Sequence, residues 1–401
     1  MQIQTGSNSS KNRAENRALV LRHLATRGAI SRIELSQLMG LTKMTLSNIT
    51  QELINEGLLV ETKKSVALSS VGRKPILLDF SPNSPCAAGV WLSRRYLRGI
   101  LCDLRGQTIY ECKEETLSKE TNVTLEKKVA EFSRRLTDAA AQFGRPLWGL
   151  GISTIGPLDV QNGILLDPHN FFGVENFPIR QIAQEATGLT VVVENEMHAS
   201  AIAEQLYGSA GDNFLYIGVS TGIGAGIITN GRLFAGSGGF GGEVGHISVD
   251  QNGPLCTCGQ RGCLELYAGI LRLTAAINEA CGLSARSIKE AIAQSQGDPR
   301  AEAVLTEVAR RIGDALCTAA NLLDPERIVL GHHAFFFPDE MLKRIEGRLN
   351  SSLVFRSRKK IPVVRSQFDD QAALVGAATL IFERIFRAEL LPEDVTTAKA
   401  E

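Results

Sequence analysis

The spacing of apolar residues changes near residue 87, and this change constrains the fold more than any other feature. Before it, short segments such as Glu15–Arg27 carry apolar residues at helical intervals. After it, a block of strand-like runs followed by alternating strands and helices occurs twice, first from Ala87 and again from Phe214. This order predicts an α/β body of two lobes with a cleft between them, behind a small helical head.

The head carries the start and stop signals of a helix-turn-helix. Ser31 with Glu34 fits a capping box, Gly40 ends the second short helix, and Thr42 caps a third helix that ends near Gly57. Three strand-like pieces follow, so the pattern predicts a winged helix-turn-helix. The domains expected are a winged helix-turn-helix over residues 1–82 and a body over residues 83–401, with lobe one at 83–195 plus the C-terminal helix and lobe two at 196–370.

The charge is unevenly distributed. The 401 residues contain 43 Lys and Arg and 43 Asp and Glu, so the net charge is zero. Residues 1–80, however, carry 11 basic and 6 acidic side chains, which gives +5 there and −5 in the remainder. A basic head on an acidic body suits an anionic partner at one end of the chain. The overall composition, with 44% hydrophobic and 21% charged residues, excludes a wholly disordered or collagen-like chain.

Neither a membrane span nor a secretory signal is visible. No apolar run approaches the ~20 residues that cross a bilayer, and the first residues lack the apolar stretch of a signal peptide. We therefore expect a cytoplasmic protein without membrane insertion, whose cysteines are reduced thiols or metal ligands rather than disulfides.

The third helix of the head is the expected recognition helix. Its first residues are short and polar or basic, so they can reach base edges and phosphates in a major groove, while a basic turn in the wing suits a minor groove. The alternative is a small helical domain that binds protein or has no binding partner. The DNA contacts predicted are Thr42, Lys43, Thr45 and Asn48 on the helix and Arg73 and Lys74 on the wing.

A histidine and three cysteines crowd into one glycine-rich stretch. His246 is followed by Cys256, Cys258 and Cys263, and three thiolates with one imidazole complete a four-coordinate Zn²⁺ site. Because four protein ligands leave no position for water, such a zinc ion is expected to be structural. The alternative is a set of reduced cysteines without metal.

Polar side chains cluster beside the same stretch and after one predicted strand. Asn195 and Glu196 follow the strand, Glu243 lies three residues before His246, and Glu265 lies two residues after Cys263. Carboxylates, an amide and an imidazole around a cleft suit a sugar, whose hydroxyls need paired donors and acceptors. Each of them taken singly also fits a solvated surface group.

The segment from Gly236 to Glu265 resembles the signature of the ROK family of repressors, open reading frames and kinases, with its Gly-Glu-x-Gly-His and Cys-x-Cys-Gly-x-x-Gly-Cys-x-Glu elements. The likeness extends over about residues 85–390, and a DNA-binding head is typical of its repressor branch. It implies an actin-like, sugar-kinase-type fold, with the head as a winged helix-turn-helix. It implies zinc on His246, Cys256, Cys258 and Cys263, and sugar contacts from Asn170, Asn195, Glu196, Glu243, His246 and Glu265.

Departures from the kinase pattern indicate which class of the family, repressor or kinase, the chain resembles. Kinases of this family begin the body with Asp-x-Gly-Gly-Thr, whose glycines let the backbone approach ATP phosphates, whereas this chain has Trp91-Leu92-Ser93-Arg94-Arg95. The catalytic Asp of the kinases is replaced by Glu196, which is one methylene longer. Phosphoryl transfer depends on positioning and charge neutralisation, so these changes argue against a working ATP site.

The resulting hypothesis is a sugar-responsive transcriptional repressor of carbohydrate metabolism genes and not an enzyme. Its expected partners are double-stranded operator DNA, a sugar or sugar phosphate effector, a second copy in a homodimer or homotetramer, and a regulatory protein that replaces or assists the sugar. The alternatives are an ATP-dependent sugar kinase with a DNA-binding head and a partner-binding scaffold without ligand.

Overall fold

The computed structural model describes residues 11–62, 76–115, 121–168, 171 and 173–390. The chain divides into two compact units, one of residues 1–196 with 374–401 and the other of residues 197–373. The polypeptide therefore passes from one unit to the other at two points, after Glu196 and after Ala373. Among the described residues, no helix combines the length and hydropathy that a membrane span requires.

The N-terminal segment forms three helices and a small antiparallel sheet in the order β1-β3-β2. The expected capping box is present, since Ser31 Oγ accepts from the Glu34 backbone N–H at 3.2 Å and the Glu34 carboxylate accepts from the Ser31 N–H at 3.0 Å. Thr42 Oγ1 caps α3 by accepting from the Thr45 N–H at 3.2 Å. The elements are α1 (Lys11–Arg27), β1 (Ile30–Ser31), α2 (Arg32–Met39), α3 (Lys43–Asn55), β2 (Leu59–Thr62) and β3 (Leu77–Phe80).

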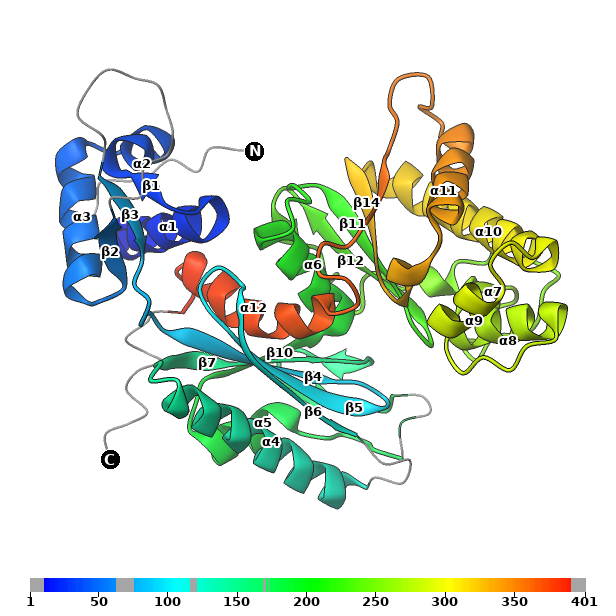
Figure 1. The fold of residues 1–401 in the computed structure, drawn as a ribbon, viewed down its shortest axis with the longest axis horizontal. Coiled ribbons are helices and arrows are strands. Elements are labelled where there is room, and N and C mark those ends of the chain that lie inside the picture. The colour runs from blue at the N-terminus through cyan, green and yellow to red at the C-terminus, as the bar shows by residue number, and fades with distance from the viewer. Residues whose placement is uncertain (1–10, 63–75, 116–120, 169–170, 172, 391–401) are drawn as a thin grey trace. The chain divides into compact units, whose positions relative to one another are not determined.

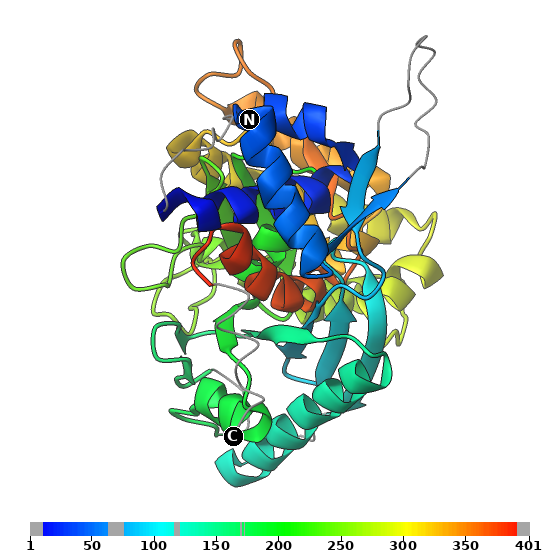
Figure 2. The same cartoon turned by 90° about the vertical axis from the view of Figure 1, so that its left-hand side faces the viewer.

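A five-stranded sheet forms the centre of the first unit's body. The strand order is β10-β7-β4-β5-β6, with β4, β7 and β10 parallel and β5 and β6 antiparallel to their neighbours. Helices α4 and α5 cover one face and α12 the other (Figures 1 and 2). The elements are β4 (Cys86–Leu92), β5 (Tyr96–Cys102), β6 (Thr108–Glu115), α4 (Asn122–Gln142), β7 (Leu147–Thr154), β8 (Leu158–Asp159), β9 (Ile164–Leu165), α5 (Ile179–Thr187), β10 (Val191–Asn195) and α12 (Ala372–Phe386).

The second unit repeats the same strand arrangement. Its sheet has the order β13-β12-β11-β14-β15, in which β11, β14 and β15 are parallel and β12 and β13 antiparallel. The elements are α6 (Glu196–Leu206), β11 (Phe214–Val219), β12 (Ile223–Thr229), β13 (Arg232–Leu233), η1 (Val244–His246), α7 (Glu265–Ala268), α8 (Ile270–Cys281), α9 (Ile288–Gln294), α10 (Pro299–Leu323), β14 (Arg327–His332), η2 (His333–Phe336), α11 (Asp339–Ser352) and β15 (Val363–Arg365).

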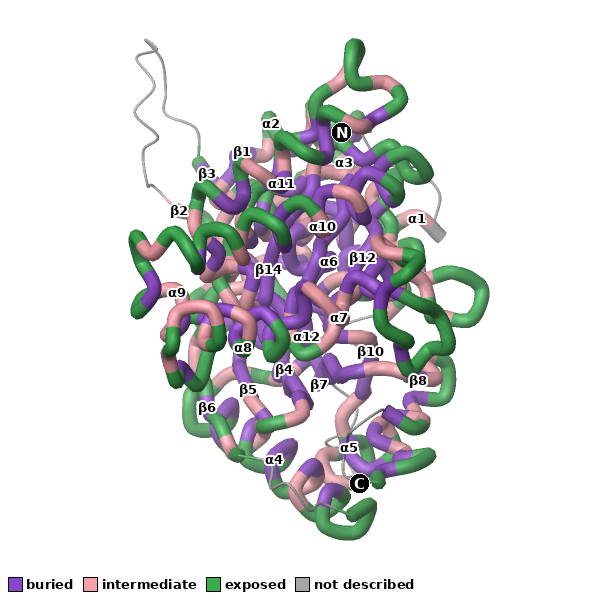
Figure 3. The backbone as a smooth tube through the Cα atoms, turned by 90° about the vertical axis from the view of Figure 1, so that its right-hand side faces the viewer, coloured by how far each residue is buried: buried purple, intermediate pink, exposed green. Residues whose placement is uncertain are grey.

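The central strands of both sheets are buried on their two faces, as their purple colour in Figure 3 shows. Along β11, Leu215 and Ile217 pack toward α8 and α10, while Phe214 and Tyr216 pack toward α6. This alternation follows from the two-residue period of a strand. In the first unit, α12 approaches the sheet closely at Gly151, where a Cβ would stand 1.8 Å from the Ala377 carbonyl oxygen.

The structure contains elements that the sequence pattern does not predict. The helix α11 and the strand β15, which forms the edge of the second sheet, were not predicted. The helical segment between Leu264 and Cys281 is broken at Gly269 into α7 and α8. A Cβ at Gly269 would lie 2.6 Å from the Glu265 carbonyl oxygen and 2.9 Å from that of Thr221, so the break lets the chain pass close to the turn after β11.

A buried carboxylate ties α6 to the segment after β15. Glu204, only 1% exposed, accepts hydrogen bonds from Ser366 Oγ at 2.5 Å and from the Gln367 backbone N–H at 2.9 Å. Burial raises the pKa of Glu204 from 4.5 to about 7, and the two hydrogen bonds oppose that shift. The contact joins α6 and the segment leading to α12, which are the two places where the chain changes unit.

The pKa of Glu204 predicts a pH-dependent stability. Because the folded state holds this proton more tightly than the unfolded state, the stabilisation is complete below pH 4.5 and is lost as pH rises through about 7. Glu204→Gln keeps an accepting oxygen without the charge. At pH 8 we expect it to raise the free energy of unfolding by roughly 1–3 kcal/mol over wild type. Chemical unfolding at pH 5 and pH 8 measures this, and a gain of equal size at both values would contradict it.

Candidate functional site

The predicted metal ligands lie together at the end of η1, which carries His246, and in the loop between η1 and α7, which carries the three cysteines. One ligand atom from each of His246, Cys256, Cys258 and Cys263 lies within 4.8 Å of every other. The Cys258 and Cys263 sulfurs are 3.6 Å apart, and Cys256 Sγ is 3.7 Å from His246 Nδ1. Ligands at about 2.0–2.3 Å from a tetrahedral ion stand about 3.5–3.8 Å from one another, so this set fits a four-coordinate metal ion.

Short backbone contacts shape this loop. Ser248 pairs with Cys263 and Leu255 with Arg261 in isolated β-bridges, which bring the cysteines back toward η1. The chain turns at Gly262, whose φ is +67° and where a Cβ would stand 1.7 Å from the Asp250 carbonyl oxygen. Only glycine fits this turn, so the spacing of the ligands depends on it.

The electrostatics of the thiols favour a bound cation. Burial and the neighbouring thiols Cys256 and Cys258 raise the pKa of Cys263 to about 12, while the backbone N–H of Gln260 lowers the pKa of Cys258. Three thiolates this close repel one another unless a positive ion lies between them. The four side chains therefore have the chemistry, as well as the spacing, of a metal site.

Two carboxylates flank the imidazole. Glu265 Oε1 lies 3.7 Å from His246 Nδ1 and accepts from the Cys256 thiol at 3.4 Å, whereas Glu243 Oε2 lies 3.9 Å from His246 Nε2. The ring thus turns one nitrogen toward the cysteines and the other toward Glu243. The Glu243 side chain is 62% exposed, so a solute can reach it.

Asn195 and Glu196 lie in the first unit, where β10 ends and α6 begins. Because β4, β7 and β10 are parallel, their carboxyl ends meet at one edge of the sheet, the usual place for ligand residues in such folds. The turn after β7 lies beside Asn195, since a Cβ on Gly156 would be 3.3 Å from Asn195 Nδ2. Asn170 lies outside the described residues.

The sequence did not predict the contact that Glu196 makes with Trp91. The indole Nε1–H of Trp91, at the end of β4, donates to Glu196 Oε2 at 2.7 Å, and both side chains are buried. The sequence signal related to this contact is that Trp91 replaces the aspartate of the kinase phosphate motif.

The turn after Trp91 is a tight hairpin between β4 and β5. Ser93 Oγ accepts from the backbone N–H groups of Arg95 at 3.3 Å and Tyr96 at 3.2 Å and donates to the Tyr96 carbonyl oxygen at 3.0 Å. These N–H groups are occupied within the hairpin. The turn therefore lacks the open, glycine-lined backbone with which a phosphate loop binds anions.

The predicted recognition residues lie at the start of α3. Thr42, Lys43 and Asn48 are exposed and Thr45 is half-buried, while Leu46 on the same helix is fully buried. Between them, the apolar side chain of Met44, which is not among the predicted DNA contacts, is 76% exposed. The predicted wing residues Arg73 and Lys74 lie outside the described residues.

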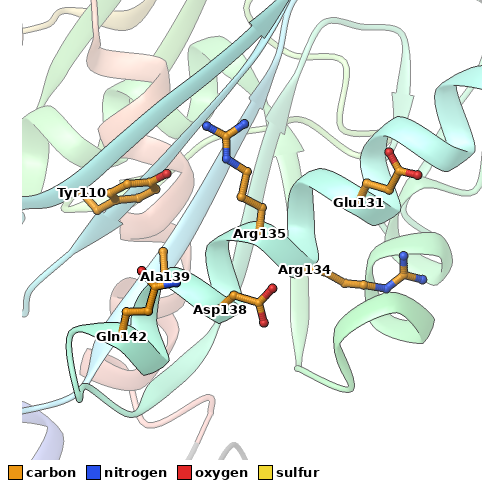
Figure 4. Close-up of a pocket in the computed structure, with 7 residues that line it drawn as sticks. All are labelled: Tyr110, Glu131, Arg134, Arg135, Asp138, Ala139 and Gln142. Atoms are coloured by element: carbon orange, nitrogen blue, oxygen red, sulfur yellow. The ribbon is translucent and has the colours of Figure 1, made fainter.

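A shallow hollow between β6 and α4 is separate from these sites (Figure 4). Arg134 and Arg135 line it together with Glu131 and Asp138, so it presents both signs of charge. Strand β6 is the edge of the sheet opposite β10, which carries Asn195. The hollow therefore takes no part in the arrangement around Asn195 and Glu196.

Comparison with known proteins decides the family. The sequence model of the ROK family matches residues 87–384. This chain belongs to the ROK family. The family and the two-lobed α/β architecture predicted from the sequence are thereby confirmed.

Several relatives match this ROK protein over nearly its whole length. The xylose repressor of Caldicellulosiruptor bescii is 29% identical over 382 residues, covering 91% of this chain and 95% of the relative. The DNA-binding transcriptional dual regulator NagC of Escherichia coli is 31% identical over 94% of each chain. A crystal structure of a ROK family transcriptional regulator, a homologue of the E. coli MLC protein, has a TM-score of 0.80 at 28% identity, covering 96% of this chain and 99% of its own.

A kinase of the family matches a smaller part. The ROK hexokinase of Thermus thermophilus is 31% identical with a TM-score of 0.63, and it covers 75% of this chain and 99% of its own. The relatives that extend across the N-terminal segment are thus named as regulators, whereas the hexokinase corresponds to part of this ROK protein.

The ligand set predicts that one thiol controls metal retention. Cys258→Ser should lower the metal content of the purified protein from about one equivalent to well below half, because serine is a poor ligand for ions that thiolates select. Metal analysis by mass spectrometry measures this. The matched control is Cys281→Ser, which changes a half-buried cysteine at the end of α8 and should keep the full equivalent. Full retention in Cys258→Ser would remove Cys258 from the ligand set.

Proposed function

We propose that this ROK protein is a sugar-responsive transcriptional regulator, a repressor of carbohydrate metabolism genes. The observation that carries the proposal is the hairpin closed by Ser93, which stands where the family's kinases bind phosphate. The chain nevertheless keeps the polar residues and the histidine and cysteine cluster of the family. The names of the xylose repressor and NagC, which align with head and body together, support the same function.

The effector in this proposal is a sugar or sugar phosphate. Carboxylate and amide groups accept and donate hydrogen bonds to hydroxyls, and an imidazole nitrogen beside them adds a further partner. The resemblance to the family supplies the proposed contact residues. They are Asn170, Asn195, Glu196, Glu243, His246 and Glu265.

The metal in the cluster is proposed to be zinc in a structural role. His246, Cys256, Cys258 and Cys263 would hold it, and three sulfurs with one nitrogen are typical of closed tetrahedral zinc sites. When bound, the ion supplies a fixed crosslink for the loop between η1 and α7. Because His246 would be both ligand and neighbour of Glu243, the crosslink would also hold the sugar-contacting groups in place.

Operator DNA is the proposed partner of the head. The exposed polar start of α3 supports its role as recognition helix, with Thr42, Lys43, Thr45 and Asn48 facing the major groove. Arg73 and Lys74 on the wing would add minor-groove or phosphate contacts. A homodimer, or a tetramer built from dimers, would place two heads on a palindromic operator.

In this mechanism the sugar favours one arrangement of the protein and so changes its affinity for DNA. The change is limited by the difference in the sugar's affinity for the two states, and a coupling of about 1–3 kcal/mol is typical. A regulatory protein partner that binds the same state would replace or assist the sugar. A cytoplasmic location fits these partners.

A kinase reaction is the second candidate, and the geometry disfavours it. The backbone groups of the hairpin are engaged by Ser93, and the carboxylate at the base position is bonded to Trp91. A sugar-dependent consumption of ATP that disappears in Glu196→Gln would overturn this conclusion. We expect no such consumption.

The decisive experiment is a gel shift of the full-length protein on DNA upstream of its own and neighbouring genes. The probes are D-xylose, D-glucose, N-acetyl-D-glucosamine and the 6-phosphate of the last, each at millimolar concentration. We expect specific binding that one probe changes by about 5- to 150-fold. If the protein binds none of these DNA fragments although its N-terminal head is folded, the proposal that it is a transcriptional regulator is contradicted.

A substitution on α3 tests the DNA face directly. Lys43→Ala should weaken operator binding and reduce the slope of log K against log salt by about 0.9, the contribution of one neutralised phosphate. The matched control is Lys343→Ala, which removes an exposed lysine on α11. Equal slopes for Lys43→Ala and wild type would exclude Lys43 from the phosphate contacts.

A further inference from the structure

The buried contact between Trp91 and Glu196 joins two positions that distinguish this chain from the family's kinases. Trp91 stands where those kinases have the acid of the phosphate motif, and Glu196 stands at their catalytic aspartate. The indole Nε1–H donates to Glu196 Oε2 at 2.7 Å. Trp91 is 4% exposed and Glu196 is 6% exposed, so the bond is shielded from water. A hydrogen bond to a charged acceptor is stronger than one between neutral groups.

The indole is braced from the neighbouring strand. Trp91 pairs with Arg98 across β4 and β5, and the Arg98 guanidinium lies over its ring, 5.9 Å from the centroid. Tyr96 meets the indole edge-on, with centroids 5.6 Å apart and planes at 85°. Arg98 is itself held by Glu111 of β6 at 2.5 Å. These contacts hold the ring plane, and with it the direction of the N–H bond.

The consequence concerns the longer side chain of Glu196. Glutamate has one more rotatable bond than aspartate, so its carboxylate is harder to hold in one place. An indole N–H is a donor only and does not titrate in the accessible pH range, so it fixes the carboxylate as an acceptor. A carboxylate has about four lone-pair sites, so it can accept from a sugar hydroxyl as well as from the indole.

We propose that Trp91 is a positioning residue for the effector: it orients the Glu196 carboxylate as a fixed acceptor for one sugar hydroxyl. This inference rests on the proposed sugar-binding role of Glu196. In the family's kinases, the position of Trp91 belongs to the phosphate motif. In this chain, Trp91 would instead serve sugar recognition.

Equilibrium binding to the full-length protein tests the proposal through a double-mutant cycle. The variants are Trp91→Phe, Glu196→Gln and the two combined, and the probes are the four sugars used in the gel shift. Phenylalanine keeps the ring packing against Tyr96 and Arg98 but removes the N–H. We expect Trp91→Phe to weaken binding of the recognised sugar by roughly 10- to 100-fold, as for a lost hydrogen bond to a charged group.

Coupling between the two positions separates positioning from packing. If Trp91 acts through Glu196, the combined variant should bind no more weakly than Glu196→Gln alone. The matched control is Trp148→Phe, on the adjacent strand β7 of the same sheet, which should bind the sugar like wild type. Losses that multiply in the combined variant, or unchanged binding by Trp91→Phe, would overturn the proposal while leaving the sugar-responsive function intact.

The indole itself gives a second readout. The chain contains two tryptophans, so protein labelled with indole ¹⁵N gives two Nε1–H signals, which Trp148→Phe assigns. Glu196→Gln should shift the Trp91 signal in sugar-free protein, and the recognised sugar should shift it further without moving that of Trp148. An unmoved Trp91 signal in Glu196→Gln would refute the contact. If wild type binds none of the four sugars, the sugar assignment of the proposed function fails and the positioning role falls with it.

Discussion

The convergence of one imidazole and three thiols is the constraint on which the functional half of the second unit depends. The loop between η1 and α7 has little regular structure of its own, and two isolated β-bridges and a turn at Gly262 define its path. Four ligand atoms within 4.8 Å of one another have the spacing and the chemistry to hold a metal ion. Glu243 lies beside His246 and Glu265 accepts from the Cys256 thiol. The positions of these two carboxylates therefore depend on the same histidine and cysteine cluster.

In the first unit, a few side chains distinguish this chain from the kinases that share its fold. Its sheet has the strand order of the second unit, and its parallel strands deliver Trp91 and Glu196 to the same edge. At that edge, Ser93 engages backbone N–H groups of its own hairpin. The Trp91 indole donates to the carboxylate of Glu196, which stands where the kinases have their catalytic aspartate. Phosphoryl transfer needs an open, positively polarised cradle, whereas recognition of a neutral hydroxyl needs a fixed acceptor. The hairpin, whose N–H groups are engaged by Ser93, does not offer the first.

Much of the architecture could be predicted because its signals are local. The capping box at Ser31 and the Thr42 cap were read correctly since each depends on residues three positions apart. Helix α11 was not predicted, although the helical spacing of its buried residues Met341, Leu342, Ile345 and Leu349 is a local signal of the same kind. Strand β15 has only three residues, and its assignment depends on pairing with β14, which no local pattern reveals.

The sequence by itself determined the chemistry available: the four candidate metal ligands, the polar residues and the absence of the kinase phosphate motif are visible as residue types at fixed spacing. Only the tertiary structure decided which groups meet. Trp91 and Glu196 are 105 residues apart, and their contact exists because β4 and β10 are parallel to β7 and end at one edge. The burial that raises the pKa of Glu204 likewise follows from packing of α6 against the segment after β15. Such contacts depend on how distant segments are brought together, and no short-range spacing encodes that.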